Sequence, residues 1–207
     1  IKGISELDPM SQKDLENLKD EISGNKFLCS ESFRSLATSI RFLNLSDNSV
    51  NTILITSTKP SEGKTTITSL IAKTLADLDN RVLLIDGDMR RPSVHKFFKL
   101  DNIQGLSSLI TDSKIKLEDV IIKTSFPNLE VITAGIRPPD PVFLLSSKQM
   151  SSLLKVAREK SYDYIIFDAP PSETLADANV LSQYTNLNLF VISLNKVERN
   201  EAKKTFN

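Results

Sequence analysis

The amino-acid sequence predicts an α/β fold, with a mostly parallel central sheet and helices on both of its faces. Short apolar runs rich in β-branched residues recur along the 207 residues, and stretches with helical spacing separate them. Strands that alternate with helices in this way are joined by right-handed crossovers and run parallel. In the first such run Ile53, Leu54 and Ile55 are consecutive, as expected of a central strand covered on both faces.

A phosphate-binding loop is predicted directly after this strand, which we place at residues 50–56. Gly63, Lys64 and Thr65 form the second half of the GxxxxGK[ST] pattern, although Thr58 stands at the first glycine position. The glycine lets the backbone approach phosphate, the lysine reaches the β and γ oxygens, and the threonine hydroxyl can ligate Mg²⁺. This pattern predicts a P-loop nucleoside triphosphatase (P-loop NTPase). The residues assigned to nucleotide binding are Lys59, Pro60, Ser61, Glu62, Gly63, Lys64, Thr65 and Thr66.

The elements after the loop continue the alternation of strands and helices. Apolar residues from Ile67 to Leu78 recur at helical spacing, which predicts a helix over 65–78. Pro170 and Pro171 end the strand before them, because proline cannot continue a central strand. Further strands are expected at 81–86, 129–134, 162–168 and 188–194. Further helices are expected at 94–98, 105–111, 177–183 and from about 197, together with a helical region that starts at the proline-rich segment 138–141 and includes 148–160.

The N-terminal part of the chain is expected to divide into a polar arm at 1–29 and the start of a domain at 30–207. Ser30 can cap a helix over 31–43 whose apolar positions form one stripe. The opposite face of that helix carries charged residues at three- and four-residue steps, which by themselves indicate an ordinary solvated face. These charged residues are Glu31, Arg34 and Arg41.

Acidic residues follow two of the predicted strands, at the sheet edge where ligands bind in such folds. The segment VLLIDGDMRRP supplies Asp86 and Asp88, and the segment YIIFDAPP supplies Asp168. An acid at the end of an apolar strand is costly to bury unpaired, so a cation is its expected partner. Mg²⁺ bound to ATP meets this expectation, with Thr65, Asp86 and Asp168 as ligands, and leaves Asp88 as a candidate base.

Composition adds few constraints on the partners of the chain. Twenty-six basic and twenty-six acidic residues give no net charge, which argues neither for nor against nucleic acid or an anionic membrane. The single cysteine, Cys29, cannot form an internal disulfide, which fits a reducing compartment. No apolar stretch approaches the roughly 20 residues that span a bilayer, so we expect a soluble segment. Because the chain begins with Ile1, we expect it to be part of a longer protein.

Together these motifs resemble those of the bacterial tyrosine kinases (BY-kinases), the cytoplasmic modules of polysaccharide co-polymerase systems. The similarity covers nearly everything from Glu31 onward, and its most specific stretch is DGDMRRP. That stretch looks like the family's second Walker motif, an apolar run followed by DxDxR. The loop with Pro60 before Gly63 and the Asp168 segment agree with the other two motifs, and Glu31 to Arg34 look like the start of the ExxRxxR oligomerisation helix.

The resemblance implies an ATP- and Mg²⁺-dependent protein-tyrosine kinase that phosphorylates in trans and regulates polysaccharide synthesis or export. It implies catalytic roles for Lys64, Asp86, Asp88, Arg90 and Asp168, with Asp88 as the base that accepts the phenol proton. The expected partners are ATP, a protein tyrosine, further copies of the chain and a membrane co-polymerase, separate or fused, but no nucleic acid. The expected location is the cytoplasm, at the inner face of the plasma membrane.

The sequence departs from the family pattern at two places. Ala37 stands where the helix motif has its second arginine, and Arg41, about 80° around the helix from Glu31, is a candidate substitute. The family's terminal tyrosine cluster is missing from the 207 residues, whose tyrosines are Tyr162, Tyr164 and Tyr184. Of these, Tyr164 is expected to face the core.

The motifs are also compatible with two other functions. The first is a MinD/ParA-like ATPase switch, because Lys59 occupies the place of their signature lysine, although Pro60 and Ser61 stand where those loops have glycines. The second is a degenerate partner in polysaccharide export that binds nucleotide weakly, which Ala37 and the missing tyrosine cluster favour. The intact Lys64 and its acidic partners argue against this second alternative.

Overall fold

The computed structural model describes residues 26–43, 51–172 and 176–193. Residue contacts divide the chain into two units, 1–43 and 44–207. In the first unit, helix α2 spans Lys26–Leu43, so it begins inside the predicted arm and five residues before the predicted start at Glu31. The rest of that arm and the predicted helix from about 197 lie outside the described residues.

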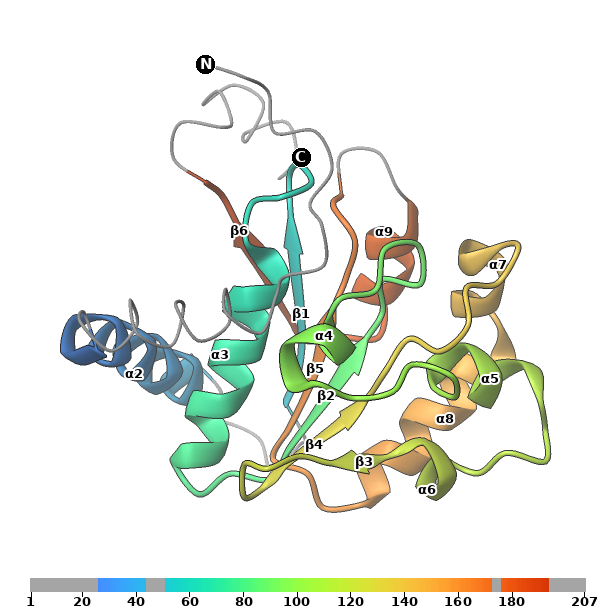
Figure 1. Cartoon of the computed structure of the whole chain (residues 1–207), viewed down its shortest axis with the longest axis horizontal. Helices are drawn as coiled ribbons and strands as arrows, with labels where there is room; N and C mark the ends of the chain where they lie inside the picture. The colour runs from blue at the N-terminus through green and yellow to red at the C-terminus, as the bar shows by residue number, and fades with distance from the viewer. Residues whose placement is uncertain (1–25, 44–50, 173–175, 194–207) are drawn as a thin grey trace. The chain divides into compact units, whose positions relative to one another are not determined.

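The second unit contains a six-stranded sheet with the strand order β3-β4-β2-β5-β1-β6 (Figure 1). All neighbouring strands are parallel except the pair β3 and β4, so the predicted mostly parallel sheet is confirmed. The strands are β1 (Asn51–Ser57), β2 (Val82–Asp86), β3 (Ile122–Lys123), β4 (Leu129–Ile132), β5 (Tyr164–Asp168) and β6 (Leu187–Val191).

Helices cover both faces of this sheet, as predicted, because successive side chains of a buried strand point to opposite faces. On one face, Leu54, Leu83 and Phe167 belong to an apolar core with residues of α5, α8 and α9. On the other face lies α3, which contacts β1, β2, β4 and β5 (Figure 1). The helices of this unit are α3 (Lys64–Asp77), α4 (Val94–Phe98), α5 (Leu106–Thr111), α6 (Leu117–Val120), α7 (Pro141–Leu145), α8 (Lys148–Glu159) and α9 (Ala176–Ser182).

Local chemistry accounts for several of these boundaries. Helix α7 begins with Pro141 at its first turn, and the side chain of Asp140 accepts a hydrogen bond from the Phe143 N–H. Ser147 caps α8 in the same way through the Met150 N–H, at 3.2 Å.

No helix within the described residues has both the length and the apolarity to cross a membrane.

The sheet register brings the predicted site together. Because β2, β5 and β1 are neighbours and parallel, the loops that follow them leave from the same edge. Asp86, the last residue of β2, is the direct register partner of Asp168, the last residue of β5. Asp168 in turn is paired with Ile55 of β1, two residues before the end of that strand, and the loop that leads to α3 follows the strand. Two acids and the phosphate-loop sequence therefore share one edge.

Candidate nucleotide-binding site

The loop between β1 and α3 turns through two residues with left-handed backbone conformation. Ser61 has φ 65° and Gly63 has φ 83°. A Cβ atom placed on Gly63 would meet no heavy atom within 4 Å, so the space in front of this residue is open. Helix α3 starts immediately behind, with the Ile67 N–H bonded to the Gly63 carbonyl at 3.0 Å. The N–H groups of its first turn have no partner inside the helix and favour an anion.

Lys64 and Asp168 form a buried ion pair at this loop. The Lys64 Nζ lies 2.7 Å from Asp168 Oδ1, and both side chains are almost completely enclosed. The hydroxyl of Thr65 donates to Asp168 Oδ2 at 2.7 Å, and the hydroxyl of Thr68 donates to Oδ1 at 2.9 Å. Ser93 reaches the same group through Thr65, with 2.9 Å between the two hydroxyl oxygens. The structure thus joins the loop lysine and hydroxyl to the acid at the end of β5.

Asp86 is completely buried beside this ion pair. Its Oδ2 accepts the N–H groups of Ser93 and Val94 at 3.2 and 3.1 Å, and its Oδ1 accepts the Asp88 N–H at 3.1 Å. Burial raises the pKa of Asp86 well above the ordinary carboxyl value; the negative charge of Asp168 acts in the same direction, and the positive charge of Lys64 acts against it. Two adjacent acids with one lysine form a site that favours an additional cation.

Asp88 and Arg90 occupy the loop after β2, and their side chains have different partners. Asp88 Oδ1 accepts the N–H groups of Arg90 and Arg91 at 3.2 and 2.9 Å, which closes a tight turn. The Arg90 guanidinium instead makes two bonds to Asp177 at the start of α9. This hydrogen-bonded pairing raises the pKa of Arg90, and the charges of Asp140 and Asp88 add to it. Arg90 is therefore held by an acid that the sequence did not single out.

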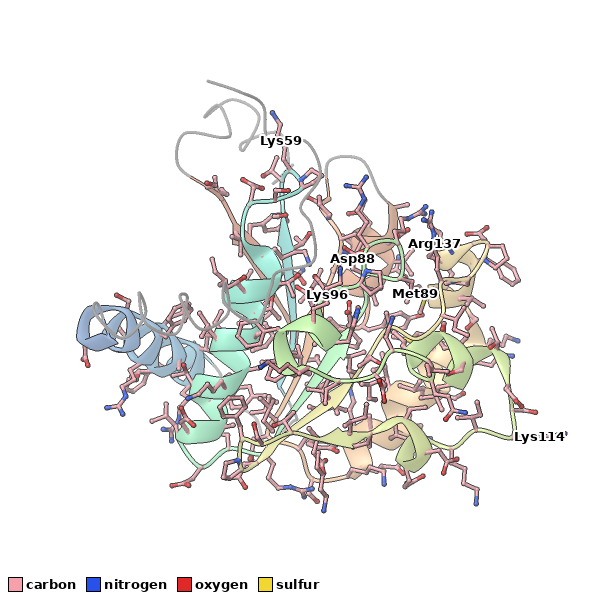
Figure 2. The ribbon with its side chains drawn as sticks, viewed as in Figure 1. Lys59, Asp88, Met89, Lys96, Lys114 and Arg137 are labelled. Atoms are coloured by element: carbon pink, nitrogen blue, oxygen red, sulfur yellow. The ribbon has the colours of Figure 1, made fainter. Side chains whose placement is uncertain are left out.

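Glu62 is a buried carboxylate inside the loop, and its side chain is bonded to the protein itself. Its Oε2 accepts the Lys59 N–H at 2.7 Å, and its Oε1 accepts the N–H of Ser193, just beyond β6, at 3.0 Å. Glu62 therefore joins the two ends of the loop and ties the loop to the neighbouring strand. Figure 2 shows Lys59 at the outer tip of the loop and Asp88 lower, near the strand ends.

We expect the substitution Glu62→Ala to weaken ATP binding, because the two N–H groups would lose their acceptor. A hydrogen bond to a charged group contributes about 1.5–3 kcal/mol, so KM for ATP should rise by roughly tenfold or more while kcat changes less. Steady-state kinetics at several ATP concentrations measure this effect. Glu159→Ala, which removes an exposed acid from α8, is the matched control. An unchanged KM in Glu62→Ala would show that the loop does not depend on this carboxylate.

The residues at this edge of the sheet fit a magnesium-bound triphosphate. Gly63 faces open space, the first turn of α3 presents N–H groups that no side chain of its N-cap residue satisfies, and Lys64 supplies a positive charge. Mg²⁺ prefers oxygen ligands and keeps several waters, so two carboxylates and one hydroxyl suffice. Thr65, Asp86 and Asp168 offer that set. No group of three or more His, Cys, Asp or Glu side chains suited to a metal occurs in the described ranges.

The raised pKa of Asp86 predicts how pH and Mg²⁺ act on stability. A carboxyl whose pKa is higher in the folded chain binds its proton more tightly there, so the contribution of Asp86 to the free energy of unfolding weakens as pH rises from about 4 through the raised pKa. Mg²⁺ binds the ionised carboxylate, so the stabilisation of the folded chain by Mg²⁺ should grow with pH. Thermal unfolding with Mg²⁺ or EDTA between pH 5 and 8, in the wild type and in Asp86→Asn, tests this. An equal Mg²⁺ shift at all pH values, or in both proteins, would contradict the assignment.

Three residues that bond to the side chains of the candidate site were not identified from the sequence alone. Thr68 lies four residues after Lys64 on α3, so helical spacing from the motif lysine could have indicated it. Ser93 and Asp177 gave no comparable signal, because their positions depend on how the loop after β2 and helix α9 fold back to the site.

In the other unit, Glu31, Arg34 and Arg41 are exposed on α2, and their proposed role in oligomerisation stays a prediction.

The strand–loop–helix geometry, the buried lysine and the acids on neighbouring strands define a P-loop NTPase fold. Comparisons with known proteins support this fold. A family model described as "AAA domain" matches residues 50–197. The tyrosine-protein kinase YwqD of Bacillus subtilis (strain 168) is 39% identical over 179 residues, covering 86% of this chain and 74% of that protein. The chain belongs to the family of bacterial tyrosine-protein kinases.

Further relatives support this family and show that the chain matches only part of some members. The tyrosine-protein kinase ptk of Acinetobacter johnsonii is 41% identical over 177 residues, which cover 86% of this chain but only 24% of that protein. Among solved structures, the kinase domain of the Escherichia coli tyrosine kinase ETK superimposes with a TM-score of 0.80 at 33% identity. This match covers 86% of the chain and 68% of that domain.

The alternative family is less similar. The septum site-determining protein MinD of Pyrococcus horikoshii, solved as a complex with Mg-ADP, matches with a TM-score of 0.59 at 25% identity. That match covers 69% of this chain and 57% of MinD. Because identity, coverage and TM-score are all lower than for the ETK kinase domain, the comparisons do not favour a MinD-like switch.

Proposed function

We propose that the chain is an ATP-dependent protein-tyrosine kinase that transfers the γ-phosphate of Mg·ATP to a tyrosine in trans. The observation that carries this proposal is the cluster in which Lys64 and Thr65 both contact Asp168, next to Asp86, at the start of α3. Membership in the tyrosine-protein kinase family supports it. Phosphoryl transfer depends mainly on positioning and charge neutralisation, and the motifs from the loop to Asp168 offer groups for both.

Each residue has a distinct role in the proposed reaction. The N–H groups around Gly63 bind phosphate oxygens, and Lys64 neutralises charge on the β and γ groups. Mg²⁺, held by Thr65, Asp86 and Asp168, would supply further charge neutralisation. The phenol oxygen bonds to the γ-phosphorus, the bond between that phosphorus and the β–γ bridging oxygen breaks, and ADP leaves. Asp88 accepts the phenol proton.

The tyrosines of the chain itself are poor acceptors in this structure. Tyr162 is buried, its hydroxyl is bonded to Glu130, and burial together with that carboxylate raises its pKa. Tyr164 is also buried, as expected, and the Tyr184 hydroxyl donates to the Leu145 carbonyl at 2.9 Å. We therefore propose that the acceptor is a tyrosine presented by another protein or by a flexible tyrosine-rich segment.

Incubation with Mg·ATP tests the proposal. The chain is mixed with a version that carries an added tyrosine-rich tail and an inactive Lys64→Met site, and phosphotyrosine is mapped by mass spectrometry. Phosphorylation of the tail on the inactive copy is expected. ATP hydrolysis without phosphotyrosine would instead support an ATPase switch, and no Mg·ATP binding would support a degenerate partner.

We extend the proposal to regulation of polysaccharide synthesis or export, at the inner face of the membrane and with a separate or fused co-polymerase. This follows from the resemblance to BY-kinases, as does assembly through α2.

We expect Arg41→Ala to reduce the mass of any assembly, because Arg41 is an exposed cation that can replace the arginine missing at Ala37. Light scattering measures the mass, and Lys155→Ala, at an exposed position of α8, is the control. An unchanged mass in Arg41→Ala would exclude this residue.

A further inference from the structure

The loop that carries Asp86 and Asp88 is fastened to helix α9 by a specific ion pair. Arg90 Nε donates to Asp177 Oδ2 at 2.7 Å, and Arg90 Nη2 donates to Asp177 Oδ1 at 3.1 Å. Asp177 is fully enclosed, whereas the Arg90 side chain keeps 29% of its surface exposed. A buried acid therefore holds a cation that is still accessible at the edge of the site.

The backbone beside this pair is packed just as closely. The Gly87 N–H donates to the Asp168 carbonyl at 2.9 Å. A Cβ atom on Gly87 would lie 2.7 Å from Leu181 Cδ1 of α9 and 3.2 Å from the same Asp168 carbonyl, so a larger residue would push the loop away from the helix. The loop after β2 consequently has little freedom relative to α9, and the ion pair acts within a fixed frame.

Two parallel bonds fix the plane of the guanidinium as well as its position. The pairing uses Nε and one hydrogen of Nη2, and among the described residues the structure shows no hydrogen-bond acceptor for Nη1. Asp88 and Asp140 also act electrostatically on Arg90 without bonding to its side chain. If Asp177 did not hold it, the guanidinium could turn toward either of these acids.

We propose that Asp177 is a positioning residue that presents the outer edge of the Arg90 guanidinium to an anionic group, the phosphoryl group in transfer. This inference rests on the proposed kinase function and deepens it. Asp177 does not contact the substrate; it determines which N–H groups of Arg90 are available and where they point. Planar, two-bond recognition of this kind requires arginine, because a lysine ammonium carries a point charge without a fixed plane.

A double-mutant cycle tests this coupling. The measured quantity is kcat for phosphotyrosine formation on a random glutamate–tyrosine copolymer with Mg·ATP, in the wild type, Arg90→Ala, Asp177→Asn and the double variant. Each single substitution should lower kcat by between about 10-fold and 100-fold, with KM for ATP little changed. The double variant should fall no further than Arg90→Ala, to within about twofold. Multiplied losses in the double variant would show that Asp177 acts independently of Arg90 and would overturn the proposal.

Asp177→Asn leaves the partly exposed Arg90 cation with a weaker, uncharged partner, so the folding of this variant is checked by thermal unfolding. Arg90→Lys provides a second test that keeps opposite charges at both positions. If Asp177 only stabilised the fold, Arg90→Lys would have kcat close to the wild type; the proposal predicts a loss of about tenfold or more at a similar melting temperature. Asp140→Asn removes an exposed acid that caps α7 near Arg90 and should leave kcat unchanged.

The same variants distinguish failure of this inference from failure of the proposed function. If the wild type forms no phosphotyrosine but hydrolyses ATP, the kinase proposal fails, and the cycle is repeated on the kcat for hydrolysis. Coupling between Arg90 and Asp177 in hydrolysis would keep the positioning role with water as the acceptor. Independent effects in both reactions would remove it.

Discussion

The substitution Lys64→Met is expected to abolish phosphoryl transfer. Lys64 Nζ lies 2.7 Å from Asp168 Oδ1, and we propose that this ammonium group neutralises charge on the triphosphate. Removal of one such preorganised charge commonly lowers kcat by about 100- to 1,000-fold. We expect at least this loss in phosphotyrosine formation, measured with saturating Mg·ATP. Wild-type turnover in Lys64→Met would refute the assignment of the site.

The same substitution should also lower stability without destroying the fold. Breaking a buried ion pair by removing one partner typically costs about 3–5 kcal/mol, because the remaining charge loses its compensation. Here Asp168 would stay enclosed beside Asp86. Circular dichroism should show retained secondary structure with a lower melting temperature. Lys73→Met is the matched control, since Lys73 lies on the same helix, pairs with Asp77 and is partly exposed.

The second large effect is expected for Asp168→Asn. Asp168 accepts the Thr65 and Thr68 hydroxyls and pairs with Lys64, so its charge supports both the lysine and the proposed metal ligands. An asparagine keeps a similar shape but removes that charge. We expect kcat to fall by about 100-fold or more, and the Mg²⁺ concentration for half-maximal activity to rise.

Magnesium titrations of phosphotyrosine formation measure this second effect. The control is Asp163→Asn on the residue immediately before β5, because Asp163 is exposed and its carboxylate accepts the Arg81 N–H at 2.7 Å. This change leaves the opposite end of the strand intact and should leave the magnesium dependence as in the wild type. An Asp168→Asn variant with unaltered magnesium dependence would remove Asp168 from the proposed ligand set.

Much of the fold could be predicted because its signals are local. The run Ile53 to Ile55 is apolar on both faces, and the helix behind the loop has a clear apolar period. The missed elements, β3 and α6, are two and four residues long, too short for a period to be read. Strand β3 is also antiparallel to β4, so its place at the edge depends on a turn between the two and on tertiary packing.

The site could be predicted only in part, for a similar reason. Lys64, Thr65 and Asp168 follow from motifs, and their meeting follows from the parallel register of the sheet. The partner of Arg90 does not, because Asp177 is 87 residues away along the chain and belongs to a short helix without a motif. Glu62 is assigned to nucleotide binding as part of the loop, and no pattern in the sequence indicates that its carboxylate bonds to the N–H groups of Lys59 and Ser193.

The most direct test is a crystal structure of the chain with Mg²⁺ and a non-hydrolysable ATP analogue. We expect the phosphates to lie against the backbone of Gly63 to Thr65, with Lys64 on their oxygens. The metal should contact the Thr65 hydroxyl and, directly or through water, Asp86 or Asp168. A nucleotide bound elsewhere, or a metal without contact to these side chains, would contradict the nucleotide site and the kinase function proposed from it.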